Sequence, residues 1–216
     1  MGQLRLGVLI SGTGRTLANL LRAATTGDIP AQVCLVVSSR RDAPGNEIAR
    51  EHGVPLVVVD ARDVRGVEAF SRAVYQALDR YRVDLVAMAG FLRRLSIRPD
   101  YVGRIMNIHP SLLPLFGGKG MYGQRVHQAV LAAGVKVSGC TVHFVDEEYD
   151  AGPIILQSCV PVLEDDTPES LAARVFAEEC RLYPEAIRLY AAGCLRIEGK
   201  RVRVLPVPSR AGIQEG

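Results

Sequence analysis

The sequence predicts an α/β fold: a single domain with one doubly wound, mostly parallel sheet and antiparallel C-terminal strands. Short apolar runs of strand length alternate with amphipathic stretches of helical length through the amino-terminal half. A glycine loop follows the first apolar run. In the carboxyl-terminal half, two further strand-length runs are joined by a short loop without a helix between them. Alternation of this kind produces parallel strands with right-handed helical crossovers, whereas strands joined by a short loop pair antiparallel.

The amino-terminal half supplies the parallel part of the sheet. Strands are expected over residues 6–10, 31–37, 54–59 and 84–89. Helices are expected from residue 17, over 46–52 and over 64–81. Ligands of such folds collect beyond the carboxyl ends of the strands, so the loops 11–16, 89–95 and 107–114 should surround one crevice.

Past Pro114 the pattern changes. The glycine-dense stretch 115–123 is expected to be a mobile substrate loop before a helix over 124–133. Strands over 136–145 and 153–162 flank a loop. A long helix then runs to residue 191, with Thr167 as its N-cap and Pro168 in its first turn. A hairpin over 195–205 completes one domain, 1–205, and residues 206–216 form a loose tail.

The composition excludes several classes of protein. The 216 residues are 48% hydrophobic and 23% charged, as is usual for a globular domain. Lys and Arg (26) and Asp and Glu (23) give a formal charge of +3 without a basic run, which favours anionic small molecules over nucleic acid. The first apolar run is too short to span a membrane. We expect small-molecule substrates, no nucleic-acid or membrane partner, and a monomer or weak homodimer.

Five cysteines stand at positions 34, 140, 159, 180 and 194. Their number is odd, and neither a Cys-x-x-Cys pair nor a zinc-type spacing with histidine is present. This pattern is typical of reduced thiols in a protein core. It predicts a cytoplasmic protein without a metal site.

Two segments carry the residues best suited to catalysis. Asn107 and His109 stand two apart before Pro110, which favours an extended backbone with both side chains on one side. Asp150 lies in a turn-like Tyr-Asp-Ala-Gly-Pro sequence. An amide, an imidazole and a carboxylate together suit acyl or formyl transfer. The alternative is a structural histidine and a plain turn.

The loop at residues 11–16, Ser-Gly-Thr-Gly-Arg-Thr, offers backbone N–H groups and a helix N-terminus, which suit a phosphate. It lacks the third glycine and the ribose-binding acid of a dinucleotide site, and the Lys-Ser/Thr of a P-loop. The alternative is a tight turn without a ligand. We favour a monophosphate site because the loop opens onto the crevice.

Three motifs resemble the formyltetrahydrofolate-dependent formyltransferase family. They are Asn-Ile-His-Pro-Ser-Leu-Leu-Pro at 107–114, Gly-Cys-Thr-Val-His-Phe-Val at 139–145 and Asp-Ala-Gly-Pro-Ile-Ile-Leu-Gln at 150–157. The resemblance implies a Rossmann-like fold, 10-formyltetrahydrofolate as one-carbon donor and phosphoribosylglycinamide as the amine acceptor, a step of purine biosynthesis. Formyltetrahydrofolate hydrolysis is the nearest alternative. Fold alone also admits a nucleotide-binding oxidoreductase or sensor.

The resemblance also implies roles for individual residues. Gly14, Arg15 and Thr16 would hold the substrate phosphate, although relatives usually carry Ser-Asn in place of Arg15-Thr16. Glu179 would contact the ribose hydroxyls; without the resemblance, Glu178 and Glu179 read as a solvated helix face. The folate would be bound by Asn107 and by a segment after the fourth strand. This segment consists of Leu92, Arg93, Arg94 and Leu95.

In the implied mechanism the substrate amine attacks the formyl group directly. Asn107 and protonated His109 would stabilise the negative charge on oxygen, and Asp150 would raise the pKa of His109 and relay the amine proton. His143 is expected to support the site. His52 and His127 are expected on helix surfaces.

Overall fold

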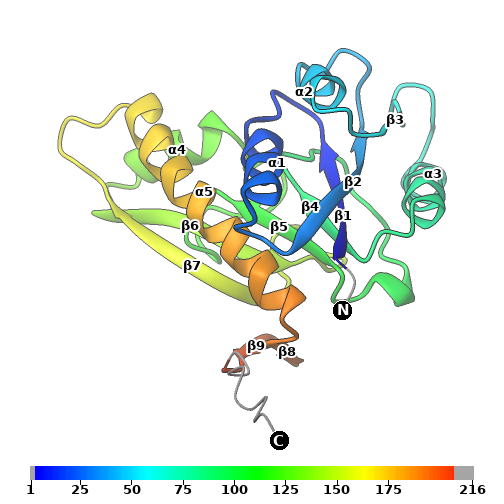
Figure 1. Cartoon of the computed structure of the whole chain (residues 1–216). Helices are drawn as coiled ribbons and strands as arrows, with labels where there is room; N and C mark the ends of the chain where they lie inside the picture. The colour runs from blue at the N-terminus through cyan, green and yellow to red at the C-terminus, as the bar shows by residue number, and fades with distance from the viewer. Residues whose placement is uncertain (1–2, 207–216) are drawn as a thin grey trace, which may run out of the picture.

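The computed structural model describes residues 3–206, which build one nine-stranded sheet in the order β3-β2-β1-β4-β5-β6-β7-β9-β8 (Figure 1). The strands are β1 (Leu4–Ile10), β2 (Ala31–Ser38), β3 (Leu56–Val58), β4 (Leu85–Met88), β5 (Ile105–His109), β6 (Val137–Phe144), β7 (Ile154–Pro161), β8 (Leu195–Glu198) and β9 (Arg201–Val204). Strands β1 to β5 pair in parallel, β6 is antiparallel to β5 and β7, and β8 and β9 form a hairpin. The predicted sheet is confirmed.

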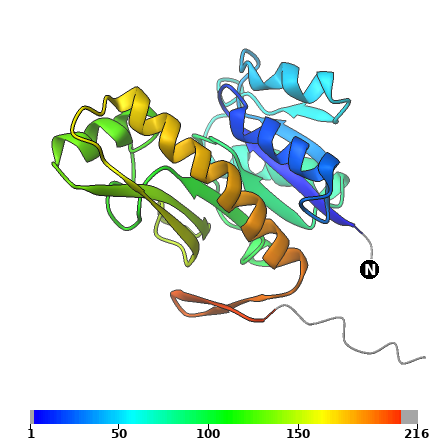
Figure 2. The same ribbon diagram turned by 60° about the vertical axis from the view of Figure 1, so that its left-hand side comes forward.

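Helices cover both faces of this sheet (Figures 1 and 2). They are α1 (Arg15–Thr26), α2 (Gly45–Glu51), α3 (Val67–Arg80), α4 (Gln124–Ala132) and α5 (Pro168–Ala191), with a short 3-10 helix at Pro99–Tyr101. Alternate residues of β1 enter opposite cores. Leu6 and Val8 pack in the cluster that includes residues of α1 and α5, and Leu9 packs in the cluster that includes α3. The period of two in strand side chains explains why the runs are apolar throughout.

A third cluster joins α4 to the antiparallel strands. Val126 and Val130 of α4 pack with Leu171 and Val175 of α5 and with residues of β6 and β7. This packing fixes α4 beside the carboxyl ends of the central strands, where it borders the site described below.

The observed boundaries correct two expectations. The helix expected from residue 64 begins at Val67, after Gly66 with φ of 87°, a conformation that a helix interior does not admit. The strand expected over 54–59 is only Leu56–Val58, because only these residues pair with β2 at the sheet edge. Thr167 caps α5 as predicted, accepting a hydrogen bond from the N–H of Ser170 (3.2 Å).

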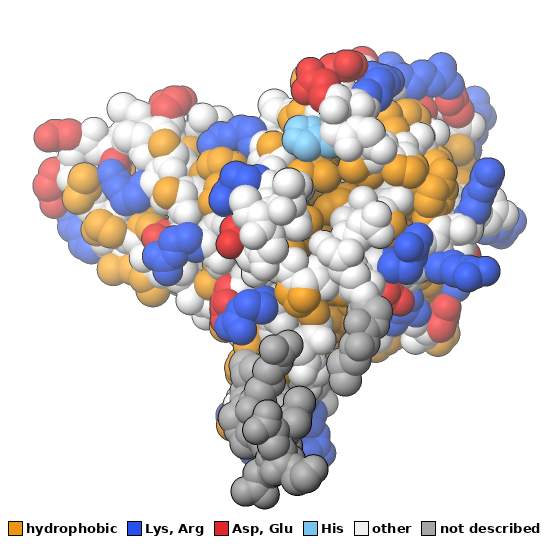
Figure 3. Space-filling model, viewed as in Figure 1, with side chains coloured by type: hydrophobic (Ala, Val, Ile, Leu, Met, Phe, Trp, Pro, Cys, Tyr) orange, Lys and Arg blue, Asp and Glu red, His pale blue; other side chains and the backbone are white. Residues whose placement is uncertain are grey.

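The expected tail, 206–216, lies outside the described residues except for Pro206, so the domain boundary at 205 stays a prediction. Within residues 3–206, none of the helices combines the length and apolar character that crossing a membrane requires. On the face drawn in Figure 3, basic and acidic side chains are interspersed rather than gathered by sign.

Candidate functional site

The loops after β1 and β4 are tied together at the carboxyl edge of the sheet, as the sequence predicted. The N–H of Ser11 donates to the carbonyl of Gly90 (3.2 Å), and the N–H of Leu92 donates to the Ser11 hydroxyl (2.9 Å). That hydroxyl also lies 2.6 Å from the hydroxyl of Ser39, which follows β2. Parallel neighbours end on the same side of a sheet, so these contacts hold the loops as one wall of the crevice.

Two adjoining pockets open at this edge. The larger is a cleft of about 790 Å³, a size that suits a small molecule, between the loop after β1, the segment 118–127 and α5. The smaller lies between the segment after β4 and the loop 145–150. Four residues line both pockets: Phe91, Asn107, Tyr149 and Asp150. Ligands in the two pockets would therefore meet at Asn107 and Asp150.

Strand β5 presents Asn107 and His109 to the larger cleft, as expected of residues two apart in a strand. The His109 ring is buried, with 4% of its side chain exposed. Its Nε2–H donates to the carbonyl of Phe116 (2.9 Å), and Nδ1 lies 3.5 Å from Oδ2 of Asp150. A carbonyl oxygen only accepts, so Nε2 carries the proton when the ring is neutral. The predicted juxtaposition of Asn107, His109 and Asp150 is present.

Asp150 connects the two glycine-containing loops around the site. Its backbone has φ of 56°, and its Oδ2 accepts a hydrogen bond from the N–H of Gly118 (2.9 Å). A side chain at Gly117 would approach Leu113 and Asp150, and a Cβ at Gly152 would overlap the carbonyl oxygen of Phe144. Gly152 is therefore needed for the chain to pass this close to Phe144, whereas a side chain at Gly117 would require the Leu113 side chain to move.

His143 orients the amide of Asn107. The buried His143 ring donates Nδ1–H to the carbonyl of Phe144 (2.9 Å), which leaves Nε2 as an acceptor in the neutral ring. Nδ2 of Asn107 donates to this Nε2 at 3.2 Å and lies 3.5 Å from Oδ1 of Asp150. The NH₂ group of Asn107 thus points into the junction of the pockets. The geometry fits the supporting role expected of His143.

The pKa of His109 shifts in the direction opposite to our expectation. Burial lowers the pKa of His109, and the nearby charge of Asp150 and the Phe116 carbonyl offset this only in part. For Asp150, burial acts to raise the pKa. The contact with His143, the charge of His109 and the Gly118 N–H together outweigh burial and hold the pKa below its usual value. Around neutral pH the pair is a carboxylate beside a neutral imidazole.

The glycine loop leads directly into α1. Gly14 has φ of 79° and lies against Gly45, where a Cβ would come within 2.7 Å of the Gly45 Cα. No side chain caps α1, and no acidic residue stands in its first turn. Gly14, Arg15 and Thr16 all line the larger cleft, so backbone N–H groups and the positive end of a helix border it, as an anion requires.

Arg15 and Glu179 both line this cleft, and the charge of Arg15 acts on the Glu179 carboxyl. The guanidinium of Arg15 stacks on the Phe176 ring, 3.8 Å from its centroid. Glu179 lines the cleft but is buried, and burial raises its pKa to about 7 despite the charge of Arg15. The solvated-face reading is thus wrong for Glu179. Glu178 does not line the cleft and instead accepts a hydrogen bond from the Ser158 hydroxyl (2.6 Å).

The segment after β4 divides between the pockets. Arg93, Arg94 and Leu95 line the smaller pocket, with Leu95 buried and Arg94 donating to the carbonyl of Glu147 (3.0 Å). Leu92 is instead half-exposed beside the larger cleft. The side chain of Leu92 thus turns to the other pocket, and the expected contact of residues 92–95 with the folate stays a prediction.

Sequence reasoning missed several lining residues, of which three stand out. Phe91 and Tyr149 border both pockets, and His127 borders the larger one. His127 was expected on a helix surface but is buried. Its place beside Val126 and near Val130, which are also buried, was the signal that α4 turns this face inward. His52 is exposed, as expected.

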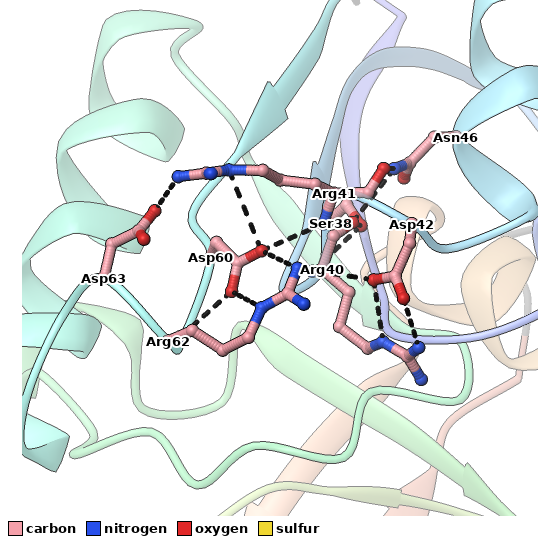
Figure 4. Close-up of polar contacts among 8 residues, drawn as sticks. All are labelled: Ser38, Arg40, Arg41, Asp42, Asn46, Asp60, Arg62 and Asp63. Carbon is pink, nitrogen blue, oxygen red and sulfur yellow. Dashed lines mark hydrogen bonds and ion pairs between the residues drawn. The ribbon is translucent and has the colours of Figure 1, made fainter.

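The region that would bind ribose in a dinucleotide fold is occupied by side chains paired with one another (Figure 4). The Ser38 hydroxyl, at the end of β2, donates to the carbonyl of Arg40 (2.8 Å). Asp42 pairs with Arg40 and Asp60 with Arg62.

In the described part of the chain, no group of three or more His, Cys, Asp or Glu side chains could hold a metal ion.

Comparison with known proteins shows what this chain is similar to. A family model described as formyl transferase matches residues 4–187. A glycinamide ribonucleotide transformylase 1 from Symbiobacterium toebii has 48% sequence identity and a TM-score of 0.88, covering 95% of this chain and 96% of that one.

Curated relatives are longer proteins. A chloroplastic phosphoribosylglycinamide formyltransferase of Arabidopsis thaliana is 41% identical over 85% of this chain, which spans 64% of that protein. A trifunctional purine biosynthetic protein adenosine-3 of Gallus gallus is 42% identical over 90% of this chain, which spans 19% of its length.

Proposed function

The chain belongs to the formyl transferase family, and we propose that it transfers the formyl group of 10-formyltetrahydrofolate to the amine of phosphoribosylglycinamide. One observation carries this proposal: two pockets adjoin, and Asn107 and Asp150 line both. Direct transfer requires donor and acceptor to be bound side by side with polar groups at their junction. The names of the relatives in the bacterium and the plant support the same reaction.

The acceptor belongs in the larger cleft. Its phosphate would lie against the N–H groups of Gly14, Arg15 and Thr16 at the start of α1, where the helix dipole favours negative charge. The Arg15 guanidinium, held by Phe176, adds a permanent positive charge at this end. Glu179 would accept hydrogen bonds from the ribose hydroxyls, with a pKa near 7 that leaves part of the population ionised at neutral pH.

The folate belongs in the smaller pocket. Met88, Phe91 and Leu95 supply apolar contacts for a ring system, and the arginines Arg93 and Arg94 stand at its edge. Apolar walls with a few polar groups are typical of cofactor sites. Leu92 borders the other pocket and would contribute through its backbone. The bound folate would supply the one-carbon unit as an electrophile at the junction.

At the junction the chain's own residues provide charge stabilisation and a proton path. The acceptor nitrogen forms a bond to the formyl carbon, the bond from that carbon to the folate nitrogen breaks, and one proton passes from the acceptor amine to the folate nitrogen. Asn107 donates an N–H to the formyl oxygen as negative charge develops there. His109 donates a second hydrogen bond from Nδ1 only in its protonated form, which the developing negative charge favours. Asp150, ionised, accepts the amine proton directly or through water.

The test is a formyl-transfer assay with both substrates, followed by mass spectrometry of the products. We expect N-formylated phosphoribosylglycinamide and tetrahydrofolate in equal amounts. Release of formate without the formylated product would instead indicate the hydrolase. Reduction of NAD(P) without formyl transfer would indicate an oxidoreductase.

We also propose that the protein works in the cytoplasm as a monomer or weak homodimer. The five cysteines, at positions 34, 140, 159, 180 and 194, are all free thiols, which suits a reducing compartment. Sedimentation over a range of protein concentrations tests the assembly state, and a stable higher oligomer would contradict it.

A further inference from the structure

The wall of the smaller pocket that carries its two arginines is the segment 90–96, which belongs to neither a helix nor a strand. No ladder of backbone hydrogen bonds therefore fixes its position. Within the described residues, its backbone N–H groups make two hydrogen bonds to the rest of the chain. That of Leu92 donates to Oγ of Ser11, and that of Ser96 donates to Oγ of Ser71, both at 2.9 Å. The residues between these two anchors, two arginines and a leucine, all line the smaller pocket.

The two anchors belong to different parts of the molecule. Ser71 lies in α3, and its hydroxyl donates to the carbonyl of Val67 (2.7 Å) in the preceding turn of the same helix. Ser11 instead opens the glycine loop, and residues 12–16, which follow it, line the larger cleft. The N–H of Ser11 donates to the carbonyl of Gly90 (3.2 Å), so this loop and the segment are joined by two hydrogen bonds. The segment is thus held at its far end by a helix and at its near end by the loop of the other pocket.

Through Ser11, a ligand in one pocket acts on the wall of the other. An anion bound to the N–H groups of residues 14–16 holds the glycine loop in one position, and the two hydrogen bonds then hold residues 90–92 as well. A folate that enters next has less of the chain to order and so binds more tightly. Resting on the proposed function, we infer that Ser11 is a positioning residue that couples the acceptor site to the folate site. By linkage, bound folate raises the affinity for the acceptor by the same factor.

Ser71 provides a matched control for Ser11. Both are buried serines, 3% and 2% exposed, that accept a hydrogen bond from the same segment at the same distance. Neither serine lines a pocket, so neither substitution by alanine removes a direct contact with a ligand. Ser71→Ala frees the end of the segment that α3 holds, whereas Ser11→Ala frees the end joined to the glycine loop. Both changes loosen the wall of the folate pocket, but only Ser11→Ala should uncouple the two sites.

Titration calorimetry with a folate analogue, in the absence and in the presence of saturating ribose 5-phosphate, measures this coupling. Ribose 5-phosphate lacks the amine that would meet the folate at the junction, so its effect on folate affinity passes through the protein. We expect it to raise the folate affinity of the wild type by about fivefold or more, as is usual for coupled sites. The ratio of the two affinities should fall close to one in Ser11→Ala, and Ser71→Ala should keep the ratio of the wild type.

The inference is rejected if the wild type shows no coupling, if Ser11→Ala keeps it, or if Ser71→Ala loses it equally. Should Ser11→Ala fail to fold, amide hydrogen exchange of the wild type gives the answer. Exchange of the Leu92 amide, which Ser11 accepts, should slow when ribose 5-phosphate binds, while exchange of the Ser96 amide stays constant. An unchanged rate at Leu92 rejects the inference. A wild type that binds neither ribose 5-phosphate nor the folate analogue would instead reject the proposed function.

Discussion

Two buried carboxylates in this molecule have contrasting partners. The side chain of Asp60 is 2% exposed and accepts from Nε (3.0 Å) and Nη2 (2.7 Å) of Arg62, and from the backbone N–H groups of Arg41 (3.2 Å) and Arg62 (2.9 Å) (Figure 4). The side chain of Asp150 is 13% exposed, and no arginine or lysine pairs with it in the described residues. One N–H, from Gly118, bonds it closely; the imidazoles of His109 and His143 lie 3.5 and 3.7 Å away.

The difference separates a structural carboxylate from a reactive one. Arginine is charged at every accessible pH, so the hydrogen bonds of Arg62 hold the pKa of Asp60 far below its usual range and use up its oxygens. Apart from the Gly118 N–H, the groups described around Asp150 lie 3.5 Å or more from its oxygens and include no arginine or lysine, so a ligand can replace them. A buried carboxylate with only one close hydrogen bond has oxygen lone pairs left for a ligand or a proton.

The largest expected effect comes from exchanging each acid for its amide. Asp150→Asn should lower kcat by about 10²- to 10⁴-fold, because it removes the proton acceptor, with little change in Tm. Asp60→Asn should do the reverse: it removes the closer of the two anions that Arg62 pairs with, leaving Asp42 at 3.5 Å, and lowers Tm by several degrees, while the folded fraction keeps its activity. Activity assays and thermal melts of both variants check this. An Asp150→Asn enzyme as active as the wild type would contradict the reactive role of Asp150.

The next effect concerns the groups that meet the developing negative charge. Asn107→Ala and His109→Ala should each raise the barrier by about 2.7–4 kcal/mol, the usual cost of losing one such donor. Single-turnover rates at saturating substrates measure this loss separately from binding. The rates would contradict the assignment if either variant transferred the formyl group as fast as the wild type.

Glu179 is an intermediate case, with one arginine nearby and no hydrogen bond to it. Its pKa is about 7 in the folded protein, above the ordinary value of 4.5. The folded state therefore binds more protons between these values, so stability is lost as pH rises from about 4.5 to 7. Glu179→Gln cannot ionise and lacks this loss. Its free energy of unfolding should therefore gain on that of the wild type between about pH 5 and 8, by on the order of 3 kcal/mol, with a matching gain in Tm. A difference independent of pH would count against the raised pKa.

The smallest effect is expected at Arg15, whose stacking on Phe176 holds a charge at the phosphate end. Arg15→Ala should weaken phosphoribosylglycinamide binding about tenfold without changing folate affinity. Arg15→Lys keeps the charge but loses the planar stack, so we expect its affinity for phosphoribosylglycinamide to lie between those of the wild type and Arg15→Ala. Calorimetry at two salt concentrations measures both, and equal affinity in all three proteins would remove Arg15 from the site.

The fold and the central residues could be predicted because local patterns determine them. Alternating apolar runs and helical stretches encode the parallel sheet, and Asn107 and His109 share one side of a strand through the period of two. The lowered pKa of His109 could not be predicted in this way, since it depends on burial beneath loops that are distant in sequence. The inward direction of His127 depends likewise on how α4 packs against α5.

A crystal structure of the protein with phosphoribosylglycinamide and a folate analogue that cannot transfer its one-carbon group tests the central claim most directly. We expect the analogue in the pocket of Arg93, Arg94 and Leu95, the phosphate on the loop before α1, and the acceptor nitrogen facing the one-carbon group between Asn107, His109 and Asp150. Ligands that bind apart, with neither reaching Asn107 and Asp150, would contradict the account.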